Sequence, residues 1–152
     1  MKIRSATKFD IPQIFDMLRH YRDAGTVNGI GGIGEIVSEE TPSKVMAYIL
    51  AGAGLAIVSE ADGKLTGMIL AIKTPQLWDH TKYIMSEVVY WVEPEHRGTT
   101  AGYRLLAAYV EACDDLKDSG HIISYTISQM NGQTLKYERF GFKPVETTWS
   151  AF

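Results

Sequence analysis

The chain has 152 residues, 45% of them hydrophobic and 22% charged, which fits one soluble globular domain spanning residues 1–152. A net charge of −3, with lysine and arginine scattered along the chain, argues against a nucleic-acid-binding surface. There is no signal-peptide pattern and no apolar run close to the roughly 20 residues of a membrane span, so we expect a cytoplasmic protein with no membrane partner.

Hydrophobic periodicity divides the first half of the chain into strands and helices. Alternating residues predict strands, and apolar residues three or four positions apart predict helices, the first of them preceded by Thr7 as a cap. Asp62-Gly63 between two apolar runs indicates a tight hairpin turn, and Gly67 indicates a bulge or a close backbone approach. The predicted elements are a strand over 2–6, a helix over 11–21, a helix over 41–50, strands over 55–60 and 65–73, and a loop over 74–81.

A glycine-rich segment, residues 29–34, matches the pattern G-x-G-x-x-G of dinucleotide-binding proteins. That pattern needs a strand before it, a helix after it and an acidic residue about 20 positions further on. Here a predicted helix precedes it and apolar residues surround Leu55, so a mobile loop between two helices is the better interpretation. The neighbouring carboxylates Glu35, Glu39 and Glu40 could attract a cationic amine or be solvated, and the sequence favours neither.

The second half of the chain is organised around a strand, a short polar turn and an amphipathic helix. The first N–H groups of a helix have no intrahelical acceptor, and the helix dipole adds partial positive charge there. With Arg97 as a cation, and with Gly98 and Gly102 admitting a ligand close to the backbone, the turn is predicted to bind an anion. The predicted elements are a strand over 83–92, a turn over 93–100, a helix from 101 to near 120, a strand over 122–127, a helix over 132–139, and strands over 142–145 and 147–152.

Two motifs in this half resemble the GCN5-related N-acetyltransferase (GNAT) family. Residues 92–106, V-E-P-E-H-R-G-T-T-A-G-Y-R-L-L, are similar to the family's acyl-CoA pyrophosphate loop, V-x-P-x-x-R-G-x-G-x-G-x-x-L-L, and residues 137–142, Y-E-R-F-G-F, to its Y-E-x-x-G-F. Residues 4–10, R-S-A-T-K-F-D, also resemble the family's N-terminus. Thr100 stands where the family usually has a glycine, and its side chain could crowd a phosphate, although its N–H and hydroxyl can still donate hydrogen bonds.

The resemblance implies an α/β fold, the GNAT-like acyl-CoA N-acyltransferase fold. Its sheet would be mixed, mostly antiparallel, flanked by about four helices, and splayed where the strand over 83–92 parts from the strand over 122–127. The implied reaction moves an acetyl group from acetyl-CoA, the co-substrate, directly to an amine of a small molecule or protein. The glycine-rich region would line the acceptor site, and because the family often dimerises, a homodimer is one expected assembly.

The same motif positions imply a set of cofactor-binding residues. The backbone of Tyr90 and Val92 would pair with the pantetheine arm like an added strand. Asn131 lies six residues before Tyr137, one fewer than the family's spacing, and is either the asparagine that contacts this arm or a helix cap. The full set is Tyr90, Val92, Arg97, Gly98, Thr99, Thr100, Ala101, Gly102, Tyr103 and Asn131.

Tyr137 and Glu87 are the candidate catalytic residues. By its place in the motif, Tyr137 would protonate the departing thiolate, since a phenol with a pKa of about 10 stays protonated at neutral pH; the alternative is a half-buried packing role. Glu87 interrupts an apolar strand, with Met85 and Val89 as its same-face neighbours. It is either a base whose pKa is raised by desolvation or a strand carboxylate that faces a sheet rim or pairs with a lysine or arginine.

Other reactive side chains give weaker signals. The one cysteine, Cys113, excludes an internal disulfide and lies on the apolar stripe of the helix that starts near 101, which favours a core position over a nucleophile. The four histidines have no metal-ligand spacing, so we expect no metal. The alternative to an enzyme is a non-catalytic module on the same fold that binds acyl-CoA or acts by protein contacts.

Overall fold

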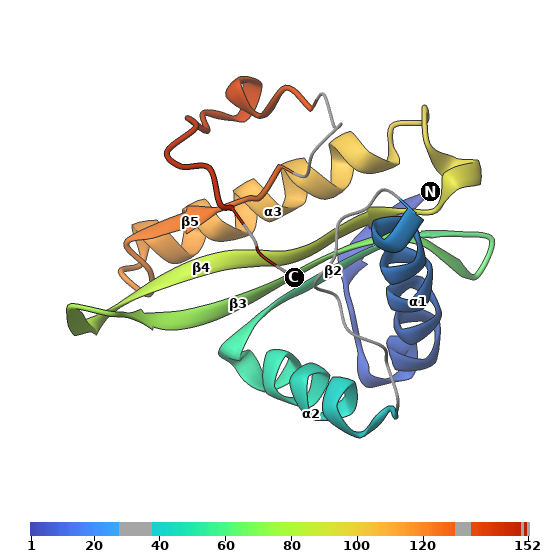
Figure 1. The fold of residues 1–152 in the computed structure, drawn as a ribbon, viewed down its shortest axis with the longest axis horizontal. Helices are drawn as coiled ribbons and strands as arrows, with labels where there is room; N and C mark the ends of the chain where they lie inside the picture. Colours follow the sequence, from blue (N-terminus) through green and yellow to red (C-terminus); the bar gives the residue numbers. More distant parts are fainter. Residues whose placement is uncertain (28–37, 130–134, 150, 152) are drawn as a thin grey trace.

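The computed structural model describes residues 1–27, 38–129, 135–149 and 151. One five-stranded sheet has the order β1-β2-β3-β4-β5, in which β5 is parallel to β4 and every other neighbouring pair is antiparallel (Figure 1). The expected mixed, mostly antiparallel sheet is therefore confirmed. The strands are β1 (Lys2–Ser5), β2 (Gly54–Ala61), β3 (Lys64–Gln76), β4 (Asp79–Val92) and β5 (Ser124–Thr126).

The described residues contain three α-helices, where about four were expected. They are α1 (Ile11–Val27), α2 (Glu40–Tyr48) and α3 (Ala101–Asp118). The remaining helix was expected over 132–139, but the described part of that range contains only the start of a 3₁₀ turn, η4 (Tyr137–Phe140). Gly141 ends this turn in the left-handed conformation, with φ of 85°, which stops it after a single turn.

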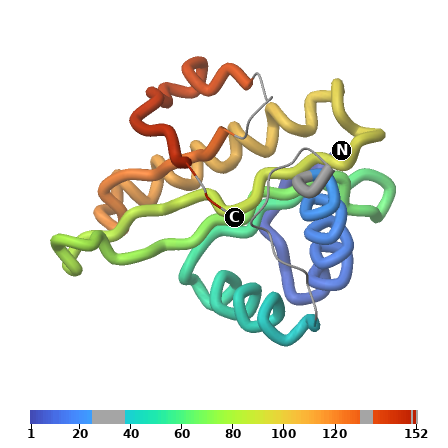
Figure 2. Tube along the Cα trace, in the orientation of Figure 1, coloured from blue at the N-terminus to red at the C-terminus, as the bar shows by residue number. Residues whose placement is uncertain are grey.

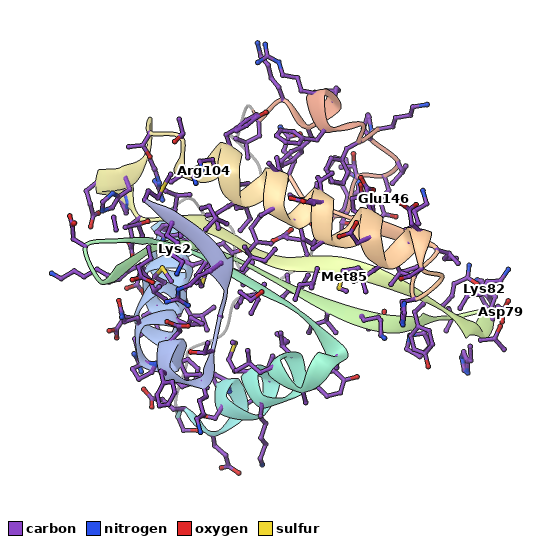
Figure 3. The ribbon with its side chains drawn as sticks, turned by 180° about the vertical axis from the view of Figure 1, so that it is seen from behind. Lys2, Asp79, Lys82, Met85, Arg104 and Glu146 are labelled. Carbon is purple, nitrogen blue, oxygen red and sulfur yellow. The ribbon has the colours of Figure 1, made fainter. Side chains whose placement is uncertain are left out.

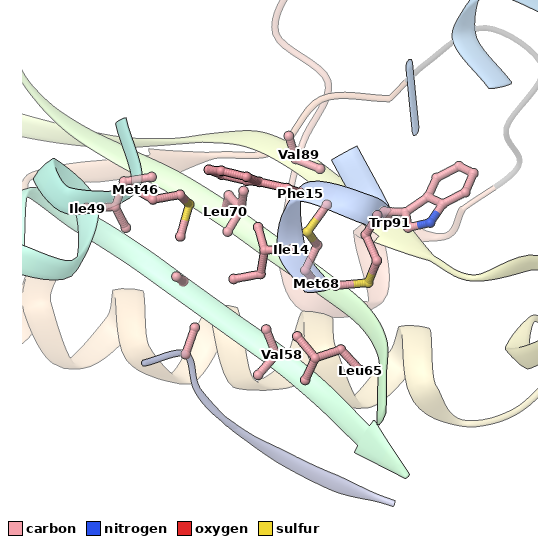
Figure 4. Packing of buried hydrophobic residues seen from close by; sticks show 13 residues of the cluster. Ile14, Phe15, Met46, Ile49, Val58, Leu65, Met68, Leu70, Val89 and Trp91 are labelled. Carbon is pink, nitrogen blue, oxygen red and sulfur yellow. The ribbon is translucent and has the colours of Figure 1, made fainter. Parts of the chain in front are cut away.

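Two apolar clusters cover the two faces of the sheet. Side chains of α1 and α2, including Ile14, Phe15 and Met46, pack on one face (Figure 4). Side chains of α3, including Leu105 and Cys113, pack on the other. Cys113 is fully buried there, as expected, and burial raises the pKa of its thiol to about 12. No helix in the described ranges is long and apolar enough to cross a membrane.

The N-terminal motif builds a local ion pair. Thr7 accepts a hydrogen bond from the N–H of Phe9, and the N–H of Thr7 donates to the carboxylate of Asp10. The Arg4 guanidinium contacts the same carboxylate at 2.8 Å and lowers the pKa of Asp10 to about 2. The residues of this motif therefore fix the turn that leads from β1 into α1.

The hairpin between β3 and β4 is longer than predicted. Residues 74–81 were expected to form a loop, but the strands continue to Gln76 and resume at Asp79, which is a correction. The tip of this hairpin projects beyond the helices (Figure 2). Most of its residues are exposed on both faces, so its sequence carries no apolar alternation. Its tip exposes Leu77 and Trp78 and is followed by an Asp79–Lys82 ion pair of 3.7 Å (Figure 3).

The two strands predicted over 142–145 and 147–152 are a further correction. No strand forms in the described residues of this segment. Phe142 packs in the α3 cluster, but Val145 and Trp149 are 85% and 90% exposed and have no sheet face to cover. Pro144 also lacks the N–H that a ladder would use.

Replacing Gly67 with alanine should destabilise the fold by about 1–3 kcal/mol. A Cβ at this position would lie 2.8 Å from the carbonyl oxygen of Trp91 and 2.9 Å from Cδ1 of Leu105. The expectation of a close approach at Gly67 is thus confirmed, and the bulge between β2 and β3 falls beside it. Urea unfolding of Gly67→Ala tests this, with Gly63→Asn as control because its turn is open and Asn tolerates positive φ. Equal stability of Gly67→Ala and the wild type would contradict this packing.

Candidate active site

The sheet opens between β4 and β5. The pairing of these strands is limited to Ile84 with Ser124, Met85 with Tyr125 and Ser86 with Thr126. After Ser86, β4 runs on to Val92 along β3 alone, because β5 ends at Thr126. Within the described residues, this edge of β4 therefore has no strand partner at the point where the strands were expected to splay.

A β-bulge in β4 sets which side chains face the opening. Leu70 pairs with Val89 and Ala71 pairs with Glu87, so Val88 is an extra residue in β4. The bulge reverses the alternation, which puts Val89 in the α1–α2 cluster while Met85 and Tyr90 lie in the α3 cluster. The expectation that Val89 shares a face with Glu87 was wrong, because a one-residue bulge moves later side chains to the opposite face.

Glu87 is a half-buried carboxylate on the α3 face of the sheet. Burial raises the pKa of its side chain to about 7, and a hydrogen bond from the backbone N–H of Ser128 partly opposes that rise. The distance from that N to Oε2 of Glu87 is 3.0 Å. Within the described ranges no lysine or arginine forms an ion pair with Glu87, so the paired-carboxylate interpretation loses its support.

Tyr137 enters the same opening from η4. Its ring is 8% exposed and contacts Phe142, and its hydroxyl donates to the carbonyl oxygen of Ser128 at 3.3 Å. Burial raises the pKa of this phenol, and the neighbouring Tyr90 and Glu87 raise it further. The group therefore stays protonated at neutral pH, in contact with the residue that also binds Glu87.

The turn between β4 and α3 presents free backbone donors. It comprises the 3₁₀ turn η3 (Pro94–His96), residues 97–100 and the first turn of α3. Within the described chain, no protein acceptor is found for the N–H groups of Gly98, Thr100, Gly102 and Tyr103. The hydroxyl oxygen of Thr99 accepts a hydrogen bond from the N–H of Ala101, the first residue of α3, so this N–H is already used. The arrangement can bind an anion, as predicted for a strand, turn and helix.

Arg97 does not point toward these donors. Its guanidinium stacks on the ring of Trp91, 4.4 Å from the centroid, and its Nε donates to the carbonyl oxygen of Val92 at 3.0 Å. Trp91 belongs to the α1–α2 cluster, on the sheet face opposite α3. The predicted cation is thus near the turn but on its far side, and the free N–H groups are the donors that the turn offers to an anion.

The edge of β4 beside the opening carries main-chain groups of Tyr90 and Val92. The N–H of Glu93 donates to the carbonyl oxygen of Thr66 on β3. Main-chain N–H and C=O groups point to alternate sides of a strand from one residue to the next, so those of Val92 and Tyr90 point away from β3. They face the side that β5 has left. Both residues therefore lie where an extended ligand arm could add as a strand. The carbonyl oxygen of Val92 already accepts a hydrogen bond from Nε of Arg97.

Gly102 has a packing role that the sequence did not indicate. The Tyr90 hydroxyl donates to the Gly102 carbonyl oxygen at 2.8 Å. A Cβ on Gly102 would lie 3.1 Å from that hydroxyl and 3.7 Å from Cγ2 of Val92. The glycine therefore lets the first turn of α3 approach β4, and it is this contact that places the free donors beside the opening.

Three sequence-predicted features lie outside the described residues: Asn131, the glycine-rich segment 29–34 and Glu35. The other carboxylates of that acidic group are engaged: Glu39 accepts from Arg19 at 2.6 Å and Glu40 from Lys44 at 2.8 Å. Sequence reasoning also missed Ser128, for which no signal exists because it acts through its main chain.

The mixed sheet that opens between β4 and β5 and the donor-rich turn after β4 are the features that the two motifs implied for an acyltransferase fold. The family model of the acetyltransferase (GNAT) domain matches residues 21–150, and the chain belongs to this family. The protein is thus an acetyltransferase of the GNAT type, as the two sequence motifs predicted. No curated protein sequence matches the chain.

Solved structures show the same fold at low sequence identity. An acetyltransferase from Trypanosoma brucei has a TM-score of 0.71 at 14% identity, over 99% of this chain and 98% of that one. Glucosamine-6-phosphate N-acetyltransferase from Arabidopsis thaliana has a TM-score of 0.71 at 16% identity, over 99% and 97%. Ribosomal-protein-alanine N-acetyltransferase from Brucella melitensis biovar Abortus has a TM-score of 0.61 at 14% identity, over 100% and 97%.

Proposed function

We propose that this protein transfers an acetyl group from acetyl-CoA directly to a primary amine within one ternary complex. One observation carries the proposal: a half-buried carboxylate with a raised pKa and a buried phenol flank the same opening in the sheet. A carboxylate with a pKa near neutrality can take a proton from an ammonium, and a phenol can give one to a thiolate.

Binding of the co-substrate would use the turn and the free edge of β4. The N–H groups of residues 98–103 and the positive end of the α3 dipole suit a pyrophosphate. The edge at Tyr90 and Val92 suits the amide groups of the pantetheine arm, which would direct the thioester toward Glu87. In the described residues Thr100 keeps a free N–H and an exposed side chain, which supports this use of the turn despite the missing glycine.

The reaction then needs three proton movements. Glu87 accepts a proton from the acceptor ammonium, directly or through a water molecule, and the neutral amine attacks the thioester carbonyl. The tetrahedral intermediate collapses by breaking its carbon–sulfur bond, and the thiolate takes the phenol proton of Tyr137. The acetylated nitrogen then returns its surplus proton to the Tyr137 phenolate, directly or through a water molecule, which leaves a neutral amide and restores the phenol. The only cysteine, Cys113, is buried in the α3 cluster, which argues against an acyl-enzyme route.

Replacing Gly98 with valine should weaken acetyl-CoA binding by about tenfold or more, because Gly98 has φ of 81°, which a β-branched residue adopts only with strain. Arg97→Ala is the matched comparison in the same turn. It should weaken binding about threefold or less, because its guanidinium contacts Trp91 and Val92 and not the free donors. Calorimetric titration measures both, and a larger loss in Arg97→Ala would show that the guanidinium reaches the phosphates.

The acceptor is proposed only as an amine of a small molecule or of a protein. Structural neighbours include a glucosamine-6-phosphate acetyltransferase, an aminoglycoside acetyltransferase and a ribosomal-protein-alanine acetyltransferase, so the fold serves both kinds. A panel of amino sugars, polyamines, amino acids and peptides, scored by release of the CoA thiol, tests the proposal. Tight acetyl-CoA binding with no amine-dependent release would favour the non-catalytic alternative.

A further inference from the structure

Ser128 contacts both candidate catalytic side chains through its main chain. Its N–H donates to Oε2 of Glu87 at 3.0 Å, and its carbonyl oxygen accepts from the hydroxyl of Tyr137 at 3.3 Å. The carboxylate comes from β4 and the phenol from η4, and no hydrogen bond joins the two directly within the described residues. Ser128 is thus the link between them.

The local structure leaves these main-chain groups available. The β4–β5 ladder ends at Thr126, two residues earlier, so neither group of Ser128 is used by the sheet. The end of β5 is itself held, because the hydroxyl of the buried Tyr109 donates to the carbonyl oxygen of Thr126 at 2.9 Å. Ser128 therefore follows a strand end that is anchored to α3.

We propose that the main chain of Ser128 is a positioning element that holds Glu87 and Tyr137 on either side of the reacting thioester. The inference rests on the proposed function, in which these two side chains act as base and acid. One oxygen of Glu87 is held by the N–H, while Oε1 has no donor among the described residues and is left to accept a proton. The Tyr137 proton rests on the Ser128 carbonyl until a thiolate, a stronger acceptor, forms nearby.

The same N–H favours the ionised form of Glu87. A donor to a carboxylate lowers its pKa, which here opposes the effect of burial. The titratable groups that face this charge are tyrosines: Tyr21 on α1, Tyr90 on β4, Tyr109 on α3 and Tyr137 on η4. Their pKa values are all raised, so none of them titrates in the range where Glu87 does.

Nuclear magnetic resonance on the wild-type protein tests the first contact without turnover. The amide proton of Ser128 should shift with pH along the same curve as the carboxyl carbon of Glu87, and this shift should vanish in Glu87→Gln. If the carboxyl carbon titrates while the Ser128 amide does not respond, the proposal is overturned. Because no acetyl transfer is involved, this result is independent of whether the proposed function holds.

Ser128→Pro removes the donor, whereas Ser128→Ala keeps both main-chain groups. In Ser128→Pro the Glu87 midpoint and the acid limb of kcat/KM should both move up by about one pH unit, while Ser128→Ala should match the wild type. A folded Ser128→Pro variant with an unchanged midpoint would overturn the proposal. If this variant does not fold, the wild-type titration decides alone. If the midpoint moves but Glu87→Gln retains full activity, the positioning contact stands and the proposed function fails.

Discussion

Replacing Glu87 with glutamine should lower kcat by about 10²–10⁴-fold, the usual contribution of a general base. Glutamine keeps the size of the side chain and can still accept from the Ser128 N–H, but it cannot take a proton at neutral pH. Steady-state rates with saturating acetyl-CoA and a reactive amine give the measurement. Acetyl-CoA affinity should remain within about threefold, because Glu87 lies apart from the donor-rich turn. Full activity in this variant would remove Glu87 from the mechanism.

The pH dependence of wild-type activity should follow the titration of Glu87. The pKa of Glu87 is raised from 4.5 to about 7 by burial, so activity should rise through pH 7 as the carboxylate forms and be lost below it. Stability should change in the opposite direction. Between pH 4.5 and 7 the folded state holds a proton that the unfolded state has released, so unfolding becomes easier as the pH rises. In Glu87→Gln, the change of activity around pH 7 and the change of stability between pH 4.5 and 7 should both disappear. Measuring the two together shows whether activity is lost with the base or with the fold.

Replacing Tyr137 with phenylalanine should lower kcat by about 10²-fold while leaving acetyl-CoA binding intact. The substitution removes the hydroxyl that donates to Ser128 and keeps the ring in the α3 cluster. The fold should lose only about 1 kcal/mol, the typical worth of one hydrogen bond. Steady-state kinetics measures kcat, thermal unfolding checks that the variant is folded, and calorimetric titration checks that acetyl-CoA still binds. A fully active variant would assign Tyr137 to packing and leave protonation of the thiolate to water.

Local sequence signals predicted much of the fold. Asp62 and Gly63 adopt φ of 51° and 75°, the turn that their dipeptide favours, and α3 begins at Ala101 as its periodicity indicated. These features depend on residues close together in the chain. The hairpin beyond Lys73 escaped prediction because an exposed ladder has no apolar period.

The sequence predicted which residues make up the candidate site better than it predicted how they contact one another. The motifs identified the turn and Tyr137, and the interruption of an apolar strand identified Glu87. In the structure Glu87 and Tyr137 both form a hydrogen bond with Ser128. The bulge at Val88, which decides the face of each later residue in β4, leaves no mark in composition. The contacts of Ser128 and the direction of the Arg97 side chain likewise depend on tertiary packing, which no local pattern encodes.

The most direct test of the account is one kinetic comparison: the initial rate of CoA thiol release from acetyl-CoA across the amine panel, with wild type and Glu87→Gln side by side. We predict amine-dependent release for at least one acceptor, rising through pH 7 in the wild type and reduced about 100-fold or more in the variant. Release that is equal in both proteins, or absent for every amine although acetyl-CoA binds, would contradict direct transfer at this site.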